Sequence, residues 1–233
     1  MKILVTGGGC KEYIDDIRAI VNRSSGTTSS VIAETLSSAG HEVTAMIGVA
    51  ERLPVGVRLI RFSGFDNLAS EMEKELTKSH YDVVIHAAAV SDYKPAGVFR
   101  ETGRTTEHGG VVKLELMPEG MQKKLDSGKI LWLKLEPTDK LIARIKHWAP
   151  DSLLIGFKLT SGAGKDEIAI SVARIMDSGA DLVVHNDIEE IENMGVRAHI
   201  WKKGEEPVSV DSNTQLAEQL LDMITDWEIE KQL

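Results

Sequence analysis

The sequence predicts an α/β protein with a Rossmann-like, doubly wound sheet that is mainly parallel and carries helices on both faces. Short apolar runs alternate with segments of helical periodicity along most of the chain. Two of these runs, residues 83–85 and 182–184, are apolar throughout, which is typical of parallel strands buried on both faces. With 233 residues and 42% hydrophobic content, the chain suits one domain, predicted over residues 1–233.

The predicted strands are apolar runs separated by turn residues. They fall at residues 3–6, 42–47, 57–61, 82–87, 131–135, 153–158 and 181–185. The predicted helices repeat their apolar residues every three or four positions. They fall at residues 30–39, 67–78, 139–147, 166–178 and 213–231. Before the last helix, short runs at residues 198–201 and 207–210 flank a charged turn with a glycine, which predicts a hairpin on the sheet edge.

Residues 91–128 form a polar segment rich in Gly, Glu and Lys that is too long for an ordinary connection inside a compact domain. We interpret this segment as a flap that closes over a ligand or reaches a partner subunit. Its composition equally allows disorder at residues 101–110.

The net charge of -9 argues against nucleic acid or an acidic membrane surface as the partner, so an anionic ligand is expected to be small. The single cysteine, Cys10, has no disulfide partner in the chain and is interpreted as a packing residue. The seven histidines show no i,i+4 pair on a helix, so no metal site built from protein side chains is predicted. Without a signal peptide or a membrane-spanning run, the chain is expected to be cytoplasmic.

Residues 18–26 gather groups that bind anions. Arg18 and Arg23 supply guanidinium groups, Asn22 supplies an amide, and Ser24 and Ser25 supply hydroxyls just ahead of a predicted helix. A helix start offers unpaired N–H groups to an anion, and either serine is a good N-cap. An oriented amide can also hold a reacting carbonyl or phosphate. We interpret this segment as the active site.

The run Val5-Thr6-Gly7-Gly8-Gly9 after the first strand, together with residues 84–89, suggests a dinucleotide-binding reductase. However, no tyrosine is followed by a lysine four residues later, as the short-chain reductases require. Glu12 also stands where the third glycine of the fingerprint belongs, and the second strand ends without a ribose-binding carboxylate. The reductase therefore stays only as an alternative that rests on fold analogy.

Small residues lie at the carboxyl end of the fourth predicted strand, at residues 87–89. Small side chains either allow close packing or leave room for a ligand to approach backbone N–H groups, with Asp92 free to accept from a sugar hydroxyl. Asn186 ends the last central strand in the same layer, where an exposed turn is the alternative interpretation.

Taken together, these segments resemble the phosphopantothenate-cysteine ligase family, also called phosphopantothenoylcysteine synthetase. Because no decarboxylase half precedes them, we expect the stand-alone bacterial form. The resemblance spans nearly the whole chain. It rests on Thr6-Gly7-Gly8-Gly9, Arg18, Asn22-Arg23-Ser24-Ser25-Gly26, Ala87-Ala88-Ala89-Val90-Ser91-Asp92-Tyr93-Lys94-Pro95, Trp148-Ala149-Pro150, Gly156-Phe157-Lys158-Leu159 and Ala180-Asp181-Leu182-Val183-Val184-His185-Asn186-Asp187.

The resemblance implies a two-step reaction of coenzyme A biosynthesis. The carboxylate of 4′-phosphopantothenate attacks the α-phosphate of a nucleoside triphosphate, which gives an acyl-nucleotide and pyrophosphate. The amine of L-cysteine then displaces the nucleotide. Activation is needed because a carboxylate oxygen is a poor leaving group until it is esterified.

Site roles are also implied by the resemblance. Asn22 would orient the acyl-phosphate, and Arg18 would bind the phosphate of phosphopantothenate, with a dimer partner's site as one possibility. The remaining roles divide between the nucleotide and the acid substrate. Gly8, Ser24 and Gly26 would cradle the triphosphate, Phe157 would stack near the base or sugar, Ala88, Ala89 and Asp92 would line the pantothenate and nucleotide pocket, and Asn186 would contact the substrate.

In the family, a flap lysine neutralises charge while the acyl-nucleotide forms. We assign this role to Lys123, with Lys124 and Lys129 as alternatives because this chain departs from the family's Lys-Ile motif. The chain also lacks the Asn-Pro-Asp element of the bifunctional enzymes, and Phe157-Lys158-Leu159 is closer to the eukaryotic, ATP-using pattern. We nevertheless expect CTP, because the chain resembles the stand-alone bacterial form, with ATP as the alternative and Mg²⁺ on the polyphosphate.

A homodimer is expected, with the flap and the strand near Leu131 at its interface. The rival interpretations are the NAD(P)-dependent reductase and a nucleotide-binding domain without turnover.

Overall fold

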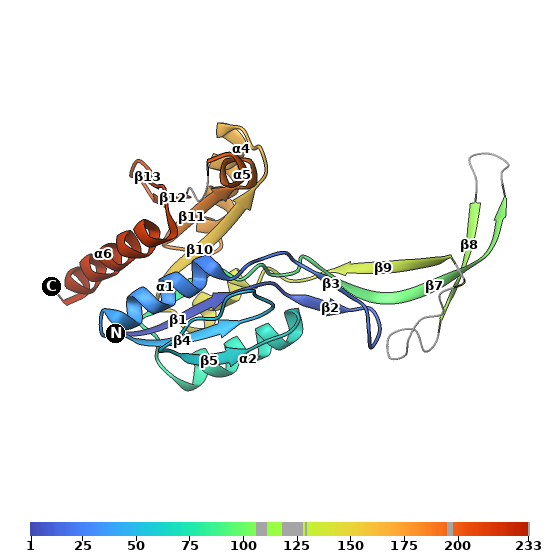
Figure 1. The fold of residues 1–233 in the computed structure, drawn as a ribbon, viewed down its shortest axis with the longest axis horizontal. Helices are drawn as coiled ribbons and strands as arrows, with labels where there is room; N and C mark the ends of the chain where they lie inside the picture. Colours follow the sequence, from blue (N-terminus) through green and yellow to red (C-terminus); the bar gives the residue numbers. More distant parts are fainter. Residues whose placement is uncertain (106–110, 118–127, 129, 195–197, 233) are drawn as a thin grey trace.

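The computed structural model describes residues 1–105, 111–117, 128, 130–194 and 198–232 (Figure 1). Within these residues an eight-stranded sheet forms the centre of the molecule. Its strands are parallel from β5 (Arg58–Arg61) to β11 (Leu182–Asp187), and β12 (Ala198–Lys202) pairs antiparallel with both β11 and β13 (Val208–Val210). This confirms the predicted α/β, doubly wound fold. In spatial order the strands are β13 (Val208–Val210), β12 (Ala198–Lys202), β11 (Leu182–Asp187), β10 (Leu153–Thr160), β6 (Val83–His86), β1 (Lys2–Gly7), β4 (Glu42–Ile47) and β5 (Arg58–Arg61).

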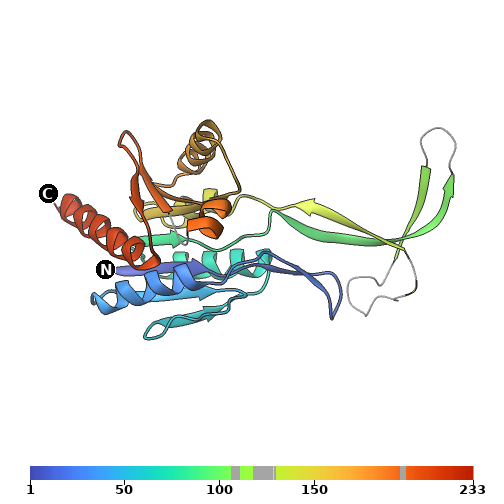
Figure 2. The same ribbon diagram turned by 45° about the horizontal axis from the view of Figure 1, so that its top comes forward.

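Helices cover both faces of this sheet, as Figure 2 shows. Apolar residues of α1 and α6 pack on one face, and those of α2, α3 and α4 pack on the other. We call these the α1/α6 face and the α2/α3/α4 face. The helices are α1 (Thr27–Ser38), α2 (Phe65–Lys78), α3 (Ile142–Trp148), α4 (Lys165–Asp177) and α6 (Asn213–Gln232).

The order of the strands reverses between β1 and β6. From β1 the chain builds outward to β4 and β5 on one side, and it then returns to place β6, β10 and β11 on the other side. Ligands of open α/β sheets bind beyond the carboxyl ends of the strands at this reversal. We call this region the switch edge.

A hairpin of β2 (Lys11–Tyr13) and β3 (Ala19–Val21) stands between β1 and the first helix and was not predicted. Its three-residue strands are too short to produce a recognisable alternation. The same holds for α5 (Ile188–Met194), which has two turns. The first helix begins at Thr27 rather than Ser30, and α3 begins at Ile142 rather than Asp139.

The strand predicted at residues 131–135 forms, but its expected place in the parallel sheet is wrong. It belongs to β9 (Leu131–Pro137), which pairs antiparallel with β7 (Tyr93–Thr105). β7 also pairs with β8 (Val111–Leu116). Within the part of the chain that the structure describes, β8, β7 and β9 form a three-stranded sheet that extends away from the body (Figure 1). We call it the projection. Apolar residues of β9 such as Trp132 and Leu135 are exposed, so the apolar run reflects something other than burial in the central sheet.

The predicted flap overlaps this projection. Residues 93–105 and 111–116 are paired strands rather than a loop, whereas residues 106–110 and 118–127 lie outside the described residues. The predicted edge hairpin is confirmed as β12 and β13.

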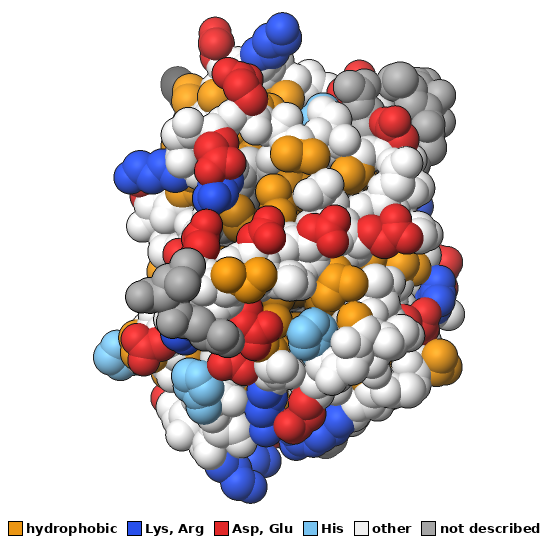
Figure 3. Space-filling model, turned by 90° about the vertical axis from the view of Figure 1, so that its left-hand side faces the viewer, with side chains coloured by type: hydrophobic (Ala, Val, Ile, Leu, Met, Phe, Trp, Pro, Cys, Tyr) orange, Lys and Arg blue, Asp and Glu red, His pale blue; other side chains and the backbone are white. Residues whose placement is uncertain are grey.

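Figure 3 views the end of the molecule that carries both termini, where acidic side chains form a row across the surface and Lys and Arg lie toward the margins. This fits the net charge of -9. No helix within the described residues is long and apolar enough to cross a membrane.

Candidate active site at the switch edge

Asn22 lies directly against the glycine-rich turn that follows β1. Its backbone N–H donates to the carbonyl of Cys10 over 3.0 Å. A Cβ atom added to Gly9 would lie 1.9 Å from the backbone oxygen of Asn22, so only glycine allows this approach. Gly9 is also held between two other loops, because it forms backbone bridges to Val49 and Ala89. The turn and the segment with Asn22 therefore form one packed unit.

The side chain of Asn22 connects this unit to the loop after β6. Its Nδ2 donates to the backbone carbonyl of Val90 over 3.0 Å. Gly8 contacts the same loop, since its carbonyl accepts from the N–H of Ala89 over 2.8 Å. The structure thus brings together the predicted site residues Asn22, Gly8 and Ala89, which come from three separate segments of the chain.

The predicted serine cap of the first helix is wrong, because Gly26 occupies the N-cap position of α1 with a left-handed φ of 72°. A Cβ at Gly26 would also lie 2.5 Å from the Cβ of Ala50. Ser24 and Ser25 instead accept from the N–H groups of Gly26 and Thr27 over 3.4 and 3.3 Å. Because glycine offers no capping side chain, the later N–H groups of the first turn are available to an anion.

The backbone N–H groups at residues 87–90 were expected to be available to a ligand, but they donate hydrogen bonds within the protein. Ala88 donates to Thr6 Oγ1 over 3.2 Å, and Ala89 donates to Gly8. Ala88 and Ala89 are half-buried, so the space above their small side chains is what they contribute to a pocket. Asp92 is likewise not free, because Lys140 Nζ donates to its Oδ1 over 2.5 Å.

Thr6 and His86 support this loop from below and were missed as site residues. The hydroxyl of Thr6 lies 2.9 Å from His86 Nδ1, and it also accepts from Ala88. Burial lowers the pKa of His86 to about 4, so the imidazole is neutral at pH 7. Its Nδ1 can then accept the Thr6 proton. Thr6 at the end of an otherwise apolar strand is the signal that could have indicated this support.

Phe157 and Asn186 lie near the carboxyl ends of neighbouring parallel strands, β10 and β11. Asn186 is in register with Leu159, and Phe157 packs partly against the α1/α6 face. The adjacent Asp187 is buried and accepts from Thr160 Oγ1 over 2.6 Å and from the N–H of Gly162 over 3.0 Å. The hydrogen bond from Thr160 is the main reason why the pKa of Asp187 lies well below its usual range. Asp187 therefore fixes the turn after β10 beside the site.

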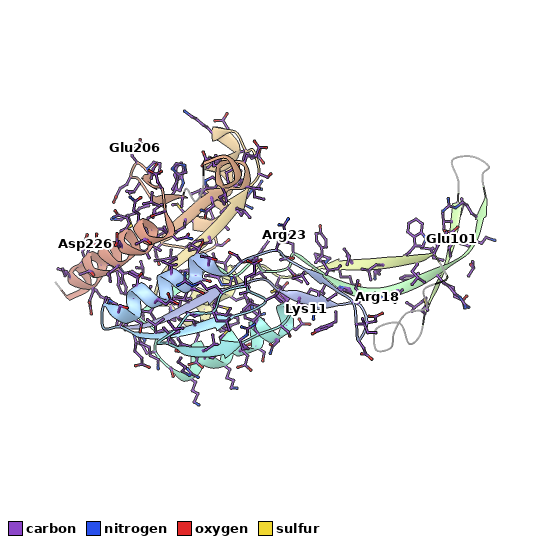
Figure 4. All side chains as sticks on the ribbon, in the orientation of Figure 1. Lys11, Arg18, Arg23, Glu101, Glu206 and Asp226 are labelled. Carbon is purple, nitrogen blue, oxygen red and sulfur yellow. The ribbon has the colours of Figure 1, made fainter. Side chains whose placement is uncertain are left out.

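Arg18 lies apart from the other predicted site residues, in the turn of the β2–β3 hairpin. Figure 4 shows it farther out along the hairpin than Lys11, beside the base of the projection. The buried carboxylate of Asp15 shapes this turn, because its Oδ1 accepts from the N–H groups of Ile17 and Arg18 over 2.9 and 2.6 Å. The Arg18 Nε also lies 3.6 Å from Asp15 Oδ2.

Glu12, which interrupts the dinucleotide fingerprint, caps another helix. Its Oε1 accepts from the N–H of Phe65, the first residue of α2, over 2.7 Å. After Gly9 the chain enters the hairpin, so the helix that would follow the glycines in a dinucleotide-binding motif begins only at Thr27. This local structure weighs against the reductase.

The thiol of Cys10 is buried beneath the site, and burial raises its pKa to about 11. It is therefore a neutral packing group, as predicted. The flap residues Lys123, Lys124 and Lys129 lie outside the described residues.

A cleft of about 340 Å³ opens beside the switch edge, between α2, α3 and the base of the projection. Its cations are neutralised by its own carboxylates, because Lys94 pairs with Asp66 over 2.8 Å and Arg144 lies 3.6 Å from Glu73. The cleft therefore offers an anion less than the switch edge does, where a helix start, an amide and small residues converge.

Comparison with known proteins shows the family of this chain. The family model described as "DNA/pantothenate metabolism flavoprotein C-terminal domain" matches residues 1–227. The coenzyme A biosynthesis bifunctional protein CoaBC of Thermococcus kodakarensis is 36% identical over 240 residues, which cover 100% of this chain and 51% of that protein. CoaBC of Mycobacterium tuberculosis is 39% identical over 99 residues, which cover 42% of this chain and 23% of that protein. The chain therefore spans about half the length of the Thermococcus relative.

Solved structures show the same fold. The DNA/pantothenate metabolism flavoprotein from Streptococcus pneumoniae matches with a TM-score of 0.79 and 29% identity over 97% of this chain and 99% of that chain. A mutant of Cab2 in complex with phosphopantothenate-cysteine matches with a TM-score of 0.73 and 15% identity over 100% of this chain and 89% of that chain. The chain belongs to the DNA/pantothenate metabolism flavoprotein C-terminal domain family.

Proposed function

We propose that this chain is a ligase that joins 4′-phosphopantothenate to L-cysteine through an acyl-nucleotide. The observation that carries the proposal is the convergence of Asn22, the start of α1 and the small residues Ala88 and Ala89 at the switch edge. A relative named for coenzyme A biosynthesis and a structural neighbour crystallised with phosphopantothenate-cysteine support the choice of substrates.

The chemistry needs an anion site next to an oriented amide. The α1 terminus and the Gly8 turn bind the triphosphate, with Ser24 and Gly26 at the helix entrance. Asn22 then stabilises the charge that develops when an amine attacks the acyl-phosphate. Phe157 contacts the base or sugar, as a half-buried ring at the strand end allows.

The acid substrate occupies the space over Ala88 and Ala89. Asp92 and Asn186 contact the substrates in this proposal, and for Asp92 this requires exchange of its contact with Lys140. Lys123 of the flap neutralises charge in the first step. Arg18 binds the phosphate of phosphopantothenate, and its position at the hairpin tip favours the site of a second subunit.

The exposed apolar surface of the projection and hairpin supports the proposal of a homodimer. Large hydrophobic side chains there are exposed to solvent in the monomer, which indicates a partner surface. They include Tyr13, Ile17, Val21, Val111, Leu114, Leu116, Ile130, Trp132 and Leu135. Arg18 lies in the turn of the same hairpin, so a second copy that covers these side chains would lie close to Arg18. We place this enzyme in the cytoplasm.

For the nucleotide we favour CTP, with ATP as the alternative. Mg²⁺ fits as an ion held mainly by the phosphates of the nucleotide, where it would reduce their negative charge. Parallel assays with CTP and ATP at equal concentrations decide between the nucleotides.

Pyrophosphate release tests the proposed function. The ligase releases pyrophosphate only when nucleotide and phosphopantothenate are both present, and it forms the amide only when cysteine is added. Oxidation of NAD(P)H by a carbonyl substrate would instead identify the reductase. Binding of nucleotide without pyrophosphate release would identify the domain without turnover.

A further inference from the structure

Lys158 on β10 is a half-buried cation. Among the described residues it has no carboxylate, hydrogen-bond or aromatic partner. The other half-buried Lys and Arg residues of the described structure all have a carboxylate or an aromatic ring nearby. These are Lys2, Lys11, Arg18, Lys94, Arg144 and Lys146.

The strand register places Lys158 at the switch edge on the α2/α3/α4 face. Lys158 is in register with His185, and Gly156 two residues earlier is in register with His86. A Cβ at Gly156 would touch Ile142 of α3 and Ile175 of α4, so these helices cover the strand at that level. Residues two apart share a face, and Lys158 lies about 7 Å closer to the open edge.

The pairing of β10 with β6 ends at Gly156 and His86, and a count of two residues from this pair brings Lys158 level with Ala88 of the predicted acid-substrate pocket. Ala88 follows His86 by two residues, as Lys158 follows Gly156, and Ala88 packs on the same face. Phe157, the preceding residue, points to the opposite face and packs against the α1/α6 cluster. The start of α1, which we assigned to the triphosphate, belongs to that opposite face.

A partly buried ammonium group loses hydration and is stabilised by a neighbouring anion. The register partner of Lys158 is not such an anion. Burial foremost lowers the pKa of His185, the charges of His199 and Lys158 lower it further, and Asp187 and Glu190 oppose the shift. A carboxylate or phosphate group of a ligand would therefore supply the anionic partner that Lys158 lacks among the described residues.

The charges of the reaction identify the ligand. In the proposed function, the α1 terminus binds the triphosphate, Arg18 binds the phosphate of phosphopantothenate, and Lys123 neutralises charge in the first step. The α-carboxylate of the incoming cysteine has no cation assigned to it. That carboxylate is only two bonds from the attacking amine, so its cation must lie near the acyl carbonyl, as a residue level with Ala88 does.

We propose that Lys158 binds the α-carboxylate of cysteine and so positions its amine for attack on the acyl-nucleotide. This inference rests on the proposed function and adds a substrate-binding residue to it.

The test compares Lys158→Met with the wild type and with Lys203→Met, a control at an exposed lysine in the turn between β12 and β13. Cysteine and cysteamine, which lacks the carboxylate, serve as the two nucleophiles. We expect Lys158→Met to lower kcat/KM for cysteine by about 10- to 100-fold, mainly through KM, since a charge-assisted contact is lost. Activity with cysteamine should stay within about twofold of the wild type. The control should match the wild type with both nucleophiles.

Pyrophosphate release in a single turnover without cysteine separates this inference from the proposed function. A wild-type chain that releases none refutes the ligase itself. If the wild type releases pyrophosphate and Lys158→Met slows that release, Lys158 serves the phosphates and the inference is wrong. It is also wrong if the variant keeps the wild-type preference for cysteine over cysteamine. Lys158→Gln carries the same test if the methionine variant does not fold, and Lys158→Arg should restore part of the preference for cysteine.

Discussion

The side-chain amide of Asn22 donates to the backbone carbonyl of Val90 over 3.0 Å, although the two residues are 68 positions apart in the sequence. This bond joins the segment before α1 to the loop after β6 at the switch edge. It also fixes the amide orientation, because the NH₂ group must face Val90. Asn22 is therefore positioned before any ligand binds, as electrostatic stabilisation of a developing charge requires.

We predict that Asn22→Asp separates the two half-reactions. Asparagine carries no charge, so its loss should affect anion binding less than the attack by cysteine, where the carbonyl oxygen becomes negative. Loss of one such donor costs about 2.7 to 4 kcal/mol. The variant should form the acyl-nucleotide and fail to transfer it, and mass spectrometry of quenched reactions should show the intermediate at the level of the enzyme.

Asn67→Asp is the matched control, because there the side-chain oxygen, rather than the NH₂ group, makes the contact, accepting from Ser63. It should turn over normally. Normal product formation by Asn22→Asp, or no intermediate despite binding of both substrates, would rule out the role given to Asn22.

Mixing two inactive variants should restore activity if Arg18 serves the neighbouring subunit. Lys123→Ala should slow acyl-nucleotide formation about a hundredfold, and Arg18→Ala should weaken phosphopantothenate binding. A mixed dimer then contains one intact site. Activity is measured after subunit exchange, which a labelled subunit verifies. Absence of recovery in a sample with proven exchange argues against a shared site, and wild-type pyrophosphate release by Lys123→Ala argues against the flap assignment.

Gly9→Ala should abolish turnover because its Cβ would meet the backbone oxygen of Asn22. Gly40→Ala is the control for replacing a glycine away from the site: no atom lies within 4 Å of the added Cβ, and its φ of 91° adds a strain that Gly9, outside the left-handed region, does not carry. The control should lose about 1 to 2 kcal/mol of stability and keep its activity. Thermal unfolding and pyrophosphate release measure the two effects. An active Gly9→Ala enzyme would mean that Asn22 need not lie where it does.

Glu75 should make stability depend on pH in the acid range. Arg58 donates to its carboxylate, and Tyr81 donates to Oε1 over 2.7 Å, so the Arg58 hydrogen bond foremost lowers the pKa of Glu75 below 4.5. A lowered folded-state pKa gives stability that is present above about pH 4.5 and is lost as the pH falls through the folded value. Glu75→Gln should cost about 1 to 2 kcal/mol at pH 7 and reduce the loss in acid. Chemical unfolding between pH 3 and 7 checks this, with Glu71→Gln on the same helix as control. Equal pH slopes for Glu75→Gln and wild type would contradict the assignment.

The parallel core could be predicted because its strands are continuous apolar runs. Residues 83–85 and 182–184 show this, and both lie in buried strands of the central sheet. The projection could not be predicted. Trp132 and Leu135 are equally apolar, but they are exposed in the monomer, and a sequence does not reveal whether an apolar residue meets its own core or another surface.

The candidate site could be predicted where residue type alone determines the chemistry that is proposed for it. Asn22 and Gly8 were found from their motifs, and the structure brings them together. Their supports were not found, because Thr6 and Glu12 act through contacts with residues far away in the sequence. The incorrect serine cap has a similar cause: contact with Ala50 selects glycine at residue 26, and a local capping rule does not include that contact.

Transfer of labelled oxygen tests the central claim most directly. When the carboxylate of phosphopantothenate carries oxygen-18, its attack on the α-phosphate places one labelled oxygen in the nucleoside monophosphate after cysteine displaces it. We predict equal amounts of labelled nucleoside monophosphate, pyrophosphate and phosphopantothenoylcysteine from this chain alone. Nucleoside diphosphate with labelled inorganic phosphate, or amide formation with an unlabelled monophosphate, would contradict the acyl-nucleotide account.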